Sequence, residues 1–159
     1  VMGSVVDLGC GVNGFSYPYI KQVFGDVRYV GAEASGQLVN NTNMFFDKSG
    51  FGNMCDVVHG DLFDITFVNG ILKAEDKPRL VFLFQVIDAL ENIEKDFSKK
   101  FLLEIKKNCE FIVVSMPMIS LSGKMMKAKR NWVFDFLKEN FEVLSDFDLF
   151  DERVFCLKC

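Results

Sequence analysis

The sequence has little of what metal sites are built from. His59 is the only histidine among 159 residues, whereas a zinc site needs about four nitrogen, sulfur or carboxylate ligands. The five cysteines are scattered through apparent strands, and Cys156 and Cys159, although spaced as C-x-x-C, would point to opposite faces of a strand. We therefore expect no metal site and interpret the cysteines as buried free thiols.

Long apolar runs and an excess of positive charge are also missing. No run approaches the roughly 20 residues that a membrane-spanning helix needs, and nothing resembles a signal peptide. The net charge of −4 argues against attraction of the whole surface to nucleic acid, although a local patch can still bind it. With 50% hydrophobic residues, we expect a soluble cytoplasmic protein with one domain over residues 1–159.

The most informative stretch is Val5-Val6-Asp7-Leu8-Gly9-Cys10-Gly11. A β-branched apolar run that breaks into glycines predicts a strand, a tight turn and a helix start, where an open α/β sheet binds its ligand. Gly9 and Gly11 let the backbone approach a ligand closely, and Asp7 can accept hydrogen bonds from an amine-bearing group. No Gly-Lys-Ser/Thr follows, which argues against a nucleoside triphosphatase. Any strand, turn and helix of an α/β protein could share the pattern, but the D-x-G-x-G spacing resembles the first motif of class I S-adenosylmethionine-dependent methyltransferases.

The rest of the chain alternates between strand and helix patterns. Further strands are expected over residues 27–32, 53–58, 79–84, 111–115, 141–150 and 153–158. We expect helices up to about Gly25, from Leu38 to Gly50, and over 90–107 as one long amphipathic helix. Residues 65–77 are expected to form a weak helix or an irregular crossover. Apolar faces are expected on the first helix from Phe15, Tyr19, Ile20, Val23 and Phe24, and on the second from Leu38, Val39, Met44, Phe45 and Phe46. The predicted fold is α/β: a Rossmann-like, seven-stranded, mostly parallel sheet with an antiparallel last strand and helices on both faces, as in class I methyltransferases.

Polar residues follow three of these strands. Glu33 ends the second strand about twenty residues after the glycine turn, where the methyltransferase resemblance implies a carboxylate on the ribose hydroxyls; it could instead be a helix-start carboxylate. Asp61 follows the third strand and would meet the adenine amine, or serve equally as a turn or N-cap residue. Gln85 and Asp88 follow the fourth strand, where methyl donor and acceptor would meet.

A basic segment follows the fifth strand. Lys124, Lys127, Lys129 and Arg130 lie next to Trp132 in the sequence and could hold a nucleic-acid backbone and stack a base. The alternative is an ordinary solvated helix start with Trp132 in the core, which we prefer for Trp132 alone.

Several stretches together resemble the 16S ribosomal RNA (guanine-N7) methyltransferases of the aminoglycoside-resistance family. The most specific is Val113-Val114-Ser115-Met116-Pro117-Met118-Ile119-Ser120-Leu121-Ser122-Gly123-Lys124, similar to the family's V-S-F-P-T-x-S-L-G-G-R loop; residues 4–13, 41–46 and 83–91 also match. We expect the family's basic helical N-terminal domain to be absent, and Gln85 stands where the family tends to have lysine.

The resemblance implies S-adenosylmethionine as cofactor and ribosomal RNA or the small ribosomal subunit as partner. It implies a cofactor site of Asp7, Gly9, Gly11, Glu33, Asp61 and Gln85, and RNA contacts from Ser120, Lys124, Lys127, Arg130 and Trp132. A guanine N7 has an available lone pair, so no general base is required.

Two other functions stay open: a small-molecule or protein methyltransferase with an aromatic acceptor pocket, and a non-catalytic binding or scaffold subunit. Because the first strand begins almost at once, we also expect a preceding segment or a partner chain to cover it.

Overall fold

The computed structural model describes residues 1–119 and 127–159, with the backbone alone for residues 127–129. Its strands are β1 (Ser4–Leu8), β2 (Arg28–Glu33), β3 (Cys55–His59), β4 (Arg79–Phe84), β5 (Phe111–Pro117), β6 (Glu142–Leu149) and β7 (Glu152–Lys158). Its α-helices are α1 (Tyr17–Phe24), α2 (Gly36–Lys48), α3 (Ile65–Ala74), α4 (Val86–Ile93), α5 (Phe97–Ile105) and α6 (Lys127–Asn140), with short 3-10 helices η1 (Asn13–Ser16) and η2 (Lys106–Asn108).

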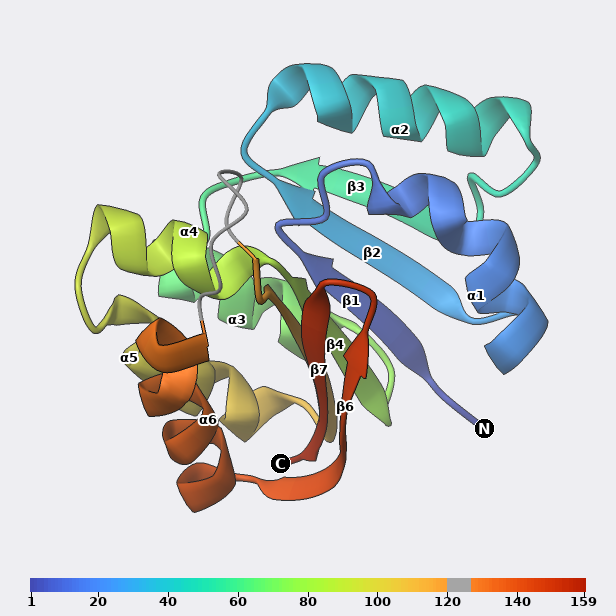
Figure 1. Ribbon diagram of the computed structural model, residues 1–159. Coiled ribbons are helices and arrows are strands. Elements are labelled where there is room, and N and C mark those ends of the chain that lie inside the picture. Colours follow the sequence, from blue (N-terminus) through green and yellow to red (C-terminus); the bar gives the residue numbers. More distant parts are fainter. Residues whose placement is uncertain (120–126) are drawn as a thin grey trace.

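The strands form one sheet in the order β3-β2-β1-β4-β5-β7-β6 (Figure 1). Strands β1 to β5 are mutually parallel, and β7 runs antiparallel to both β5 and β6. The predicted seven-stranded sheet with an antiparallel last strand is therefore confirmed. The chain adds β2 and β3 on one side of β1 and then crosses to add β4 and β5 on its other side. The strand order therefore reverses at β1, and the switch point of the sheet lies at the carboxyl end of β1.

Helices cover both faces of the sheet, which gives two apolar layers (Figure 1). Helices α1 and α2 pack with Tyr17, Ile20, Val39 and Phe46 on one face. Helices α3 to α6 form the larger cluster on the other face with side chains such as Val68, Leu90, Phe101 and Leu137. All five residues of β1 are buried, as expected for a central strand between two helical layers.

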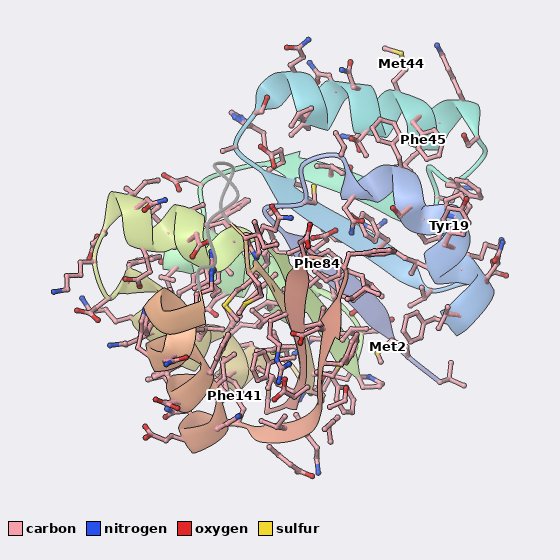
Figure 2. The ribbon with its side chains drawn as sticks, in the orientation of Figure 1. Met2, Tyr19, Met44, Phe45, Phe84 and Phe141 are labelled. Atoms are coloured by element: carbon pink, nitrogen blue, oxygen red, sulfur yellow. The ribbon has the colours of Figure 1, made fainter. Side chains whose placement is uncertain are left out.

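The predicted apolar faces of the first two helices are partly wrong. Tyr19 and Val23 are exposed on α1, and Met44 is exposed on α2; Figure 2 labels Tyr19 and Met44. The 3-10 turn η1 precedes α1, so the helix begins only at Tyr17 and its buried positions become Tyr17 and Ile20. The aromatic residues of this layer meet edge to face, as Tyr17 does with Tyr29 and Phe46.

The predicted single helix over residues 90–107 is also wrong, because α4 ends at Ile93 and α5 starts at Phe97. Asp96 between them has a left-handed backbone, with φ of 63°. The Glu91 carboxylate accepts hydrogen bonds from the Asp96 N–H at 2.9 Å and the Ser98 N–H at 3.1 Å, and from the Ser98 hydroxyl. In one continuous helix Glu91 would lie on the solvated face. Here it instead caps the start of α5.

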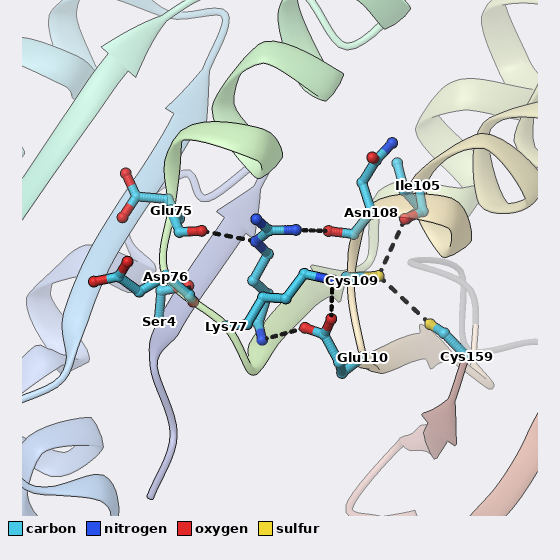
Figure 3. Close-up of polar contacts among 10 residues, drawn as sticks. Ser4, Glu75, Asp76, Lys77, Ile105, Asn108, Cys109, Glu110 and Cys159 are labelled. Atoms are coloured by element: carbon cyan, nitrogen blue, oxygen red, sulfur yellow. Dashed lines mark hydrogen bonds and ion pairs between the residues drawn. The ribbon is translucent and has the colours of Figure 1, made fainter.

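A polar network closes the amino end of the sheet between β4 and β5. The buried Arg79 side chain donates from Nε to the Glu75 carbonyl at 2.8 Å and from Nη1 to the Asn108 carbonyl at 3.0 Å. The Arg79 backbone N–H donates to Glu110 Oε2 at 2.7 Å, and Lys77 pairs with Glu110 (Figure 3). These contacts fix the ends of α3, η2 and β5 relative to one another.

The five cysteines are all free, and three of them, Cys10, Cys55 and Cys109, are buried. The thiols of Cys109 and Cys159 lie 3.5 Å apart (Figure 3). Among the described residues there is no group of three or more His, Cys, Asp or Glu side chains that could hold a metal ion. Nor does any described helix combine the length and apolarity needed to cross a membrane.

Candidate functional site

The turn after β1 folds back onto β2. The N–H groups of Gly9 and Cys10 both donate to the Ala32 carbonyl, at 2.8 and 3.1 Å. Gly9 has φ of +74°, and a Cβ on it would lie 2.9 Å from Val86 Cγ2. Glycine is therefore required here both by the backbone angle and by the close approach of α4.

Glu33 connects this turn to the loop after β2. Its Oε2 accepts from the Gly11 N–H at 2.9 Å, and its Oε1 accepts from the Ser35 N–H at 2.8 Å. A carboxylate offers about four acceptor positions, so both oxygens can accept further hydrogen bonds. The backbone thus holds the Glu33 side chain in a defined orientation at the carboxyl end of the sheet.

A cleft of about 280 Å³ lies at this end of the sheet. Its polar lining comes from the ends of three strands, with Glu33 as the last residue of β2, Asp61 after β3 and Gln85 after β4. The rest of its lining is largely apolar: Gly9, Ala34, Leu62, Phe63, Phe84, Val86, Ala89, Leu90 and Ile93. The structure thus brings Gly9, Glu33, Asp61 and Gln85 together, four of the six residues predicted around a cofactor.

The other two predicted cofactor residues, Asp7 and Gly11, do not line the cleft. The Asp7 side chain is only 1% exposed, and its Oδ2 accepts from Asn13 Nδ2 and from the Tyr29 hydroxyl, both at 2.7 Å. Burial raises the pKa of Asp7 to about 6, although the hydrogen bonds from Asn13 and Tyr29 oppose the shift. Gly11 acts through its N–H on Glu33. Both residues support the turn, and direct contact with a ligand stays a prediction.

Asp61 makes the predicted turn contact, and its predicted contact with an adenine amine stays a prediction. Its Oδ1 accepts from the Phe63 N–H at 2.9 Å, which is a local turn contact, while the residue also lines the cleft. His59 ends β3 and contacts the Ala34 carbonyl through Nε2 at 2.8 Å, so it joins the two loops beside the cleft.

Gln85 and Asp88 differ in what they face. Gln85 has a left-handed backbone with φ of 60°, lines the cleft, and donates from Nε2 to Glu152 Oε1. Asp88 was predicted to face the meeting point of donor and acceptor, but its carboxylate forms a two-pronged ion pair with Arg130. Asp88 does not line the cleft, so its predicted place is corrected to a link between α4 and α6.

The predicted RNA contacts are only partly brought together. Arg130 is 2% exposed and paired with Asp88, so its side chain is not available to a surface RNA, and that prediction is wrong. Trp132 is 37% exposed with the Lys99 ammonium 5.0 Å from its ring centroid, which corrects our placement of Trp132 in the core. Lys127 begins α6, and only its backbone is described. Ser120 and Lys124 lie outside the described residues.

Sequence reasoning missed a second cavity of about 440 Å³. It is lined by Met118, Ile119, Phe134, Lys138, Asp148, Phe150, Asp151, Glu152 and Arg153, from the end of β5, α6 and the β6–β7 turn. Only the antiparallel pairing of β7 with β5 brings this turn to the carboxyl end of the sheet, where Pro117 faces Glu152. No sequence motif identifies Glu152. The short turn between the last two strand patterns could, however, have indicated that Glu152 lies where one strand ends and the next begins.

Comparisons with known proteins identify the fold. No protein-family model matches the chain, and neither does any curated protein sequence. Similar solved structures include the 16S rRNA methylase ArmA, with a TM-score of 0.69 and 18% identity over 99% of this chain and 74% of that one. A SAM-dependent methyltransferase from Aquifex aeolicus matches with a TM-score of 0.67 and 17% identity over 98% and 81%.

A third similar structure is the mitomycin 7-O-methyltransferase MmcR, with a TM-score of 0.68 and 13% identity over 99% of this chain and 49% of that chain. The present chain thus spans about half the length of MmcR. The neighbours include both an rRNA methylase and a small-molecule methyltransferase, so the fold does not select between these acceptors. With its seven-stranded sheet and these neighbours, the chain has the Rossmann-like fold of class I methyltransferases.

Proposed function

We propose that this protein is an S-adenosylmethionine-dependent methyltransferase. The observation that carries the proposal is the Glu33 carboxylate, oriented by the N–H groups of Gly11 and Ser35 on a cleft that Gly9 also lines. The residues present suit the cofactor: a carboxylate for a diol, a second carboxylate for an amine, and apolar side chains between them.

Each group would have a separate task with the cofactor bound. Glu33 would accept hydrogen bonds from the ribose hydroxyls and Asp61 from the adenine amine, while Leu62, Phe63 and Leu90 supply apolar contacts. Gly9, which lines the cleft beside Val86, would lie next to the methionine part. When bound, the cofactor supplies an electrophilic methyl group on its sulfonium, and the protein contributes by positioning the acceptor and excluding water.

Substitution of Glu33 tests this assignment. Loss of two charge-assisted hydrogen bonds should weaken S-adenosylmethionine binding by Glu33→Ala about 100-fold in calorimetry. Glu104→Ala is the matched control, because Glu104 pairs only with exposed Lys107 in the described structure and lies on α5. Circular dichroism and a urea titration would check that the variant folds, since Glu33 also orders the turn. Unchanged affinity in folded Glu33→Ala would remove Glu33 from the site and end the proposal.

We further propose ribosomal RNA as the acceptor, with guanine N7 as the atom that the sequence resemblance implies. Lys127 and Lys129 support it, because they lie in the first turn of α6, which follows β5 and therefore starts near the carboxyl end of the sheet. Cations at this place could hold the phosphate backbone while a base approaches the cleft. The likeness to the 16S rRNA methylase ArmA agrees with this acceptor.

Methyl transfer to isolated small ribosomal subunits tests the RNA proposal. With labelled S-adenosylmethionine, we expect label in the 16S RNA, and the pair Lys127→Ala/Lys129→Ala should lower RNA affinity by about tenfold at low salt. The control pair Lys48→Ala/Lys73→Ala removes the same charge at the ends of α2 and α3. Intact cofactor binding without labelled RNA would overturn the acceptor while leaving the cofactor assignment in place.

A second acceptor class is favoured by one observation. The 440 Å³ cavity beside the cleft has an aromatic and an aliphatic wall from Phe134 and Ile119, and its size is within the roughly 300–1,000 Å³ of small-molecule sites. A free small molecule is therefore the alternative acceptor.

A further inference from the structure

The second cavity lies next to the proposed cofactor cleft, and a hydrogen bond joins a residue of one lining to a residue of the other. Gln85 lines the cleft, Glu152 lines the cavity, and Gln85 Nε2 donates to Glu152 Oε1. The backbone fixes both partners, because the Gln85 N–H donates to the Ser115 carbonyl at 3.0 Å and the Met118 N–H donates to the Asp151 carbonyl at 2.7 Å. The Gln85–Glu152 pair is thus the boundary between the two spaces.

The walls of the cavity suit a flat apolar group. Met118, Ile119 and Phe134 come from the end of β5 and from α6, and Phe150 of the β6–β7 turn also lines the cavity although it is 96% exposed. The Phe134 ring packs against Phe155, 5.4 Å between centroids, so its position is fixed by the core. An aromatic wall such as Phe134 favours a planar ring, which can stack on it.

The charges of the cavity favour a hydrogen-bond donor over an anion. Arg153 pairs with Asp146 at 2.5 Å and with Asp148 at 2.9 Å, and Lys138 lies 3.8 Å from Asp146. Both cations are therefore already neutralised by carboxylates. Glu152 is half-buried and uses Oε1 for Gln85, and a carboxylate has room for further donors.

We propose that this cavity is the acceptor site and that it takes a planar ring presenting an N–H donor to Glu152. The proposal deepens the proposed methyltransferase function and rests on it. Two sources carry the same chemistry: a base splayed out of a single-stranded RNA, and a free heteroaromatic compound. Glu152 then determines which ring edge enters, and its bond to Gln85 aligns that edge with the cleft.

Two matched probes test the donor requirement without the cofactor. Benzimidazole has a ring N–H, and 1-methylbenzimidazole lacks it. In ¹H–¹⁵N correlation spectra, benzimidazole should shift the amide signals of Met118, Phe150 and Glu152, and the methylated probe should bind about tenfold more weakly. Equal binding of the two probes, or no shift with either, would overturn the proposal.

Two variants separate Glu152 from general effects. Glu152→Met removes the acceptor while keeping a side chain of similar length, and it should weaken benzimidazole about tenfold. Glu142→Met makes the same change on β6, where Glu142 pairs with Lys158, and it should bind the probe like the unchanged protein. An unaltered affinity in folded Glu152→Met would exclude Glu152 as the recognition group.

An RNA arm distinguishes the two sources of the ring. A short single-stranded RNA that competes with benzimidazole, and loses affinity in Glu152→Met, would assign the ring to an RNA base. An RNA that leaves bound benzimidazole in place would assign the cavity to a free compound. Calorimetry with S-adenosylmethionine is run in parallel: failure of cofactor binding alone contradicts the proposed function, and failure of the probes alone contradicts this acceptor site.

Discussion

At the scale of single residues, the most informative side chain is one that does not line the cleft. Asp7 is buried under the turn and holds Asn13 and the Tyr29 hydroxyl, so it joins β1, β2 and the start of η1. Burial makes its ionised form costly, and this raises the pKa of Asp7 to about 6 from 3.8. An acid whose pKa is higher in the folded state binds a proton more tightly there than in the unfolded chain.

The pH dependence of folding should therefore report on Asp7. Between about pH 4 and 6 the folded state holds more protons than the unfolded state, so the contribution of Asp7 to stability falls as the pH rises. Asp7→Asn removes this titration. In urea unfolding at a series of pH values, the variant should gain stability relative to the unchanged protein by up to roughly 3 kcal/mol over this window. A difference between the two proteins that does not vary with pH would contradict the raised pKa.

At the scale of elements, the break between α4 and α5 decides which side chains reach the site. It ends α4 at Ile93, which lines the cleft, and it turns α5 so that Phe97 and Phe101 enter the core. Glu91 stabilises the break by accepting from the Asp96 and Ser98 N–H groups and from the Ser98 hydroxyl.

Removing this cap should destabilise the protein. Glu91→Ala leaves the first N–H groups of α5 without their carboxylate, and we expect a loss of about 2 kcal/mol. Glu94→Ala is the matched control because its nearest cation, the Lys100 ammonium, is 3.9 Å away and both side chains are exposed; it should change stability by less than about 0.5 kcal/mol. Chemical denaturation would measure both, and equal losses would show that Glu91 is not a specific cap.

At the scale of the whole molecule, the Arg79 network and the candidate cofactor cleft lie at opposite ends of the parallel strands. The network of Arg79, Glu75, Asn108 and Glu110 lies where β4 and β5 begin (Figure 3). The cleft lies where β1, β2 and β4 end. A change at one end can therefore alter the free energy of unfolding without touching the residues of the cleft.

Arg79→Lys should separate the two properties. A lysine cannot donate in two directions from a planar fork, so at least one buried carbonyl loses its partner and stability should fall by roughly 2 kcal/mol. Arg28→Lys is the control, since half-buried Arg28 makes a 3.5 Å contact with Glu75. Below the unfolding transition, calorimetry should give an unchanged affinity for S-adenosylmethionine. A loss of affinity in folded Arg79→Lys would show that the two ends are coupled.

Much of the architecture could be predicted because its local signals are strong. The bounds of β4 were predicted to the residue, since Pro78 precedes an apolar run that Gln85 ends. The sequence also predicts that Gly9 and Glu33 lie at the same cleft. Each follows or ends one of two neighbouring parallel strands, and such strands end at the same edge of the sheet. The broken helix was missed because Glu91 and Asp96 look like ordinary surface charges until the turn between them is seen.

The expected segment or partner chain covering β1 stays a prediction. In the structure β1 pairs on both sides with β2 and β4, and its five residues are buried by the described chain.

The sequence by itself determined the sheet, the glycine turn and the carboxylate that the turn orients, because apolar periodicity and glycine placement act over a few residues. Only the tertiary structure decided which polar side chains are available. Arg130 and Asp88 lie 42 positions apart and form an ion pair that engages the buried Arg130, while Gln85 and Glu152, 67 positions apart, meet between two cavities. Such pairings depend on how separate elements pack, and local spacing carries no record of them.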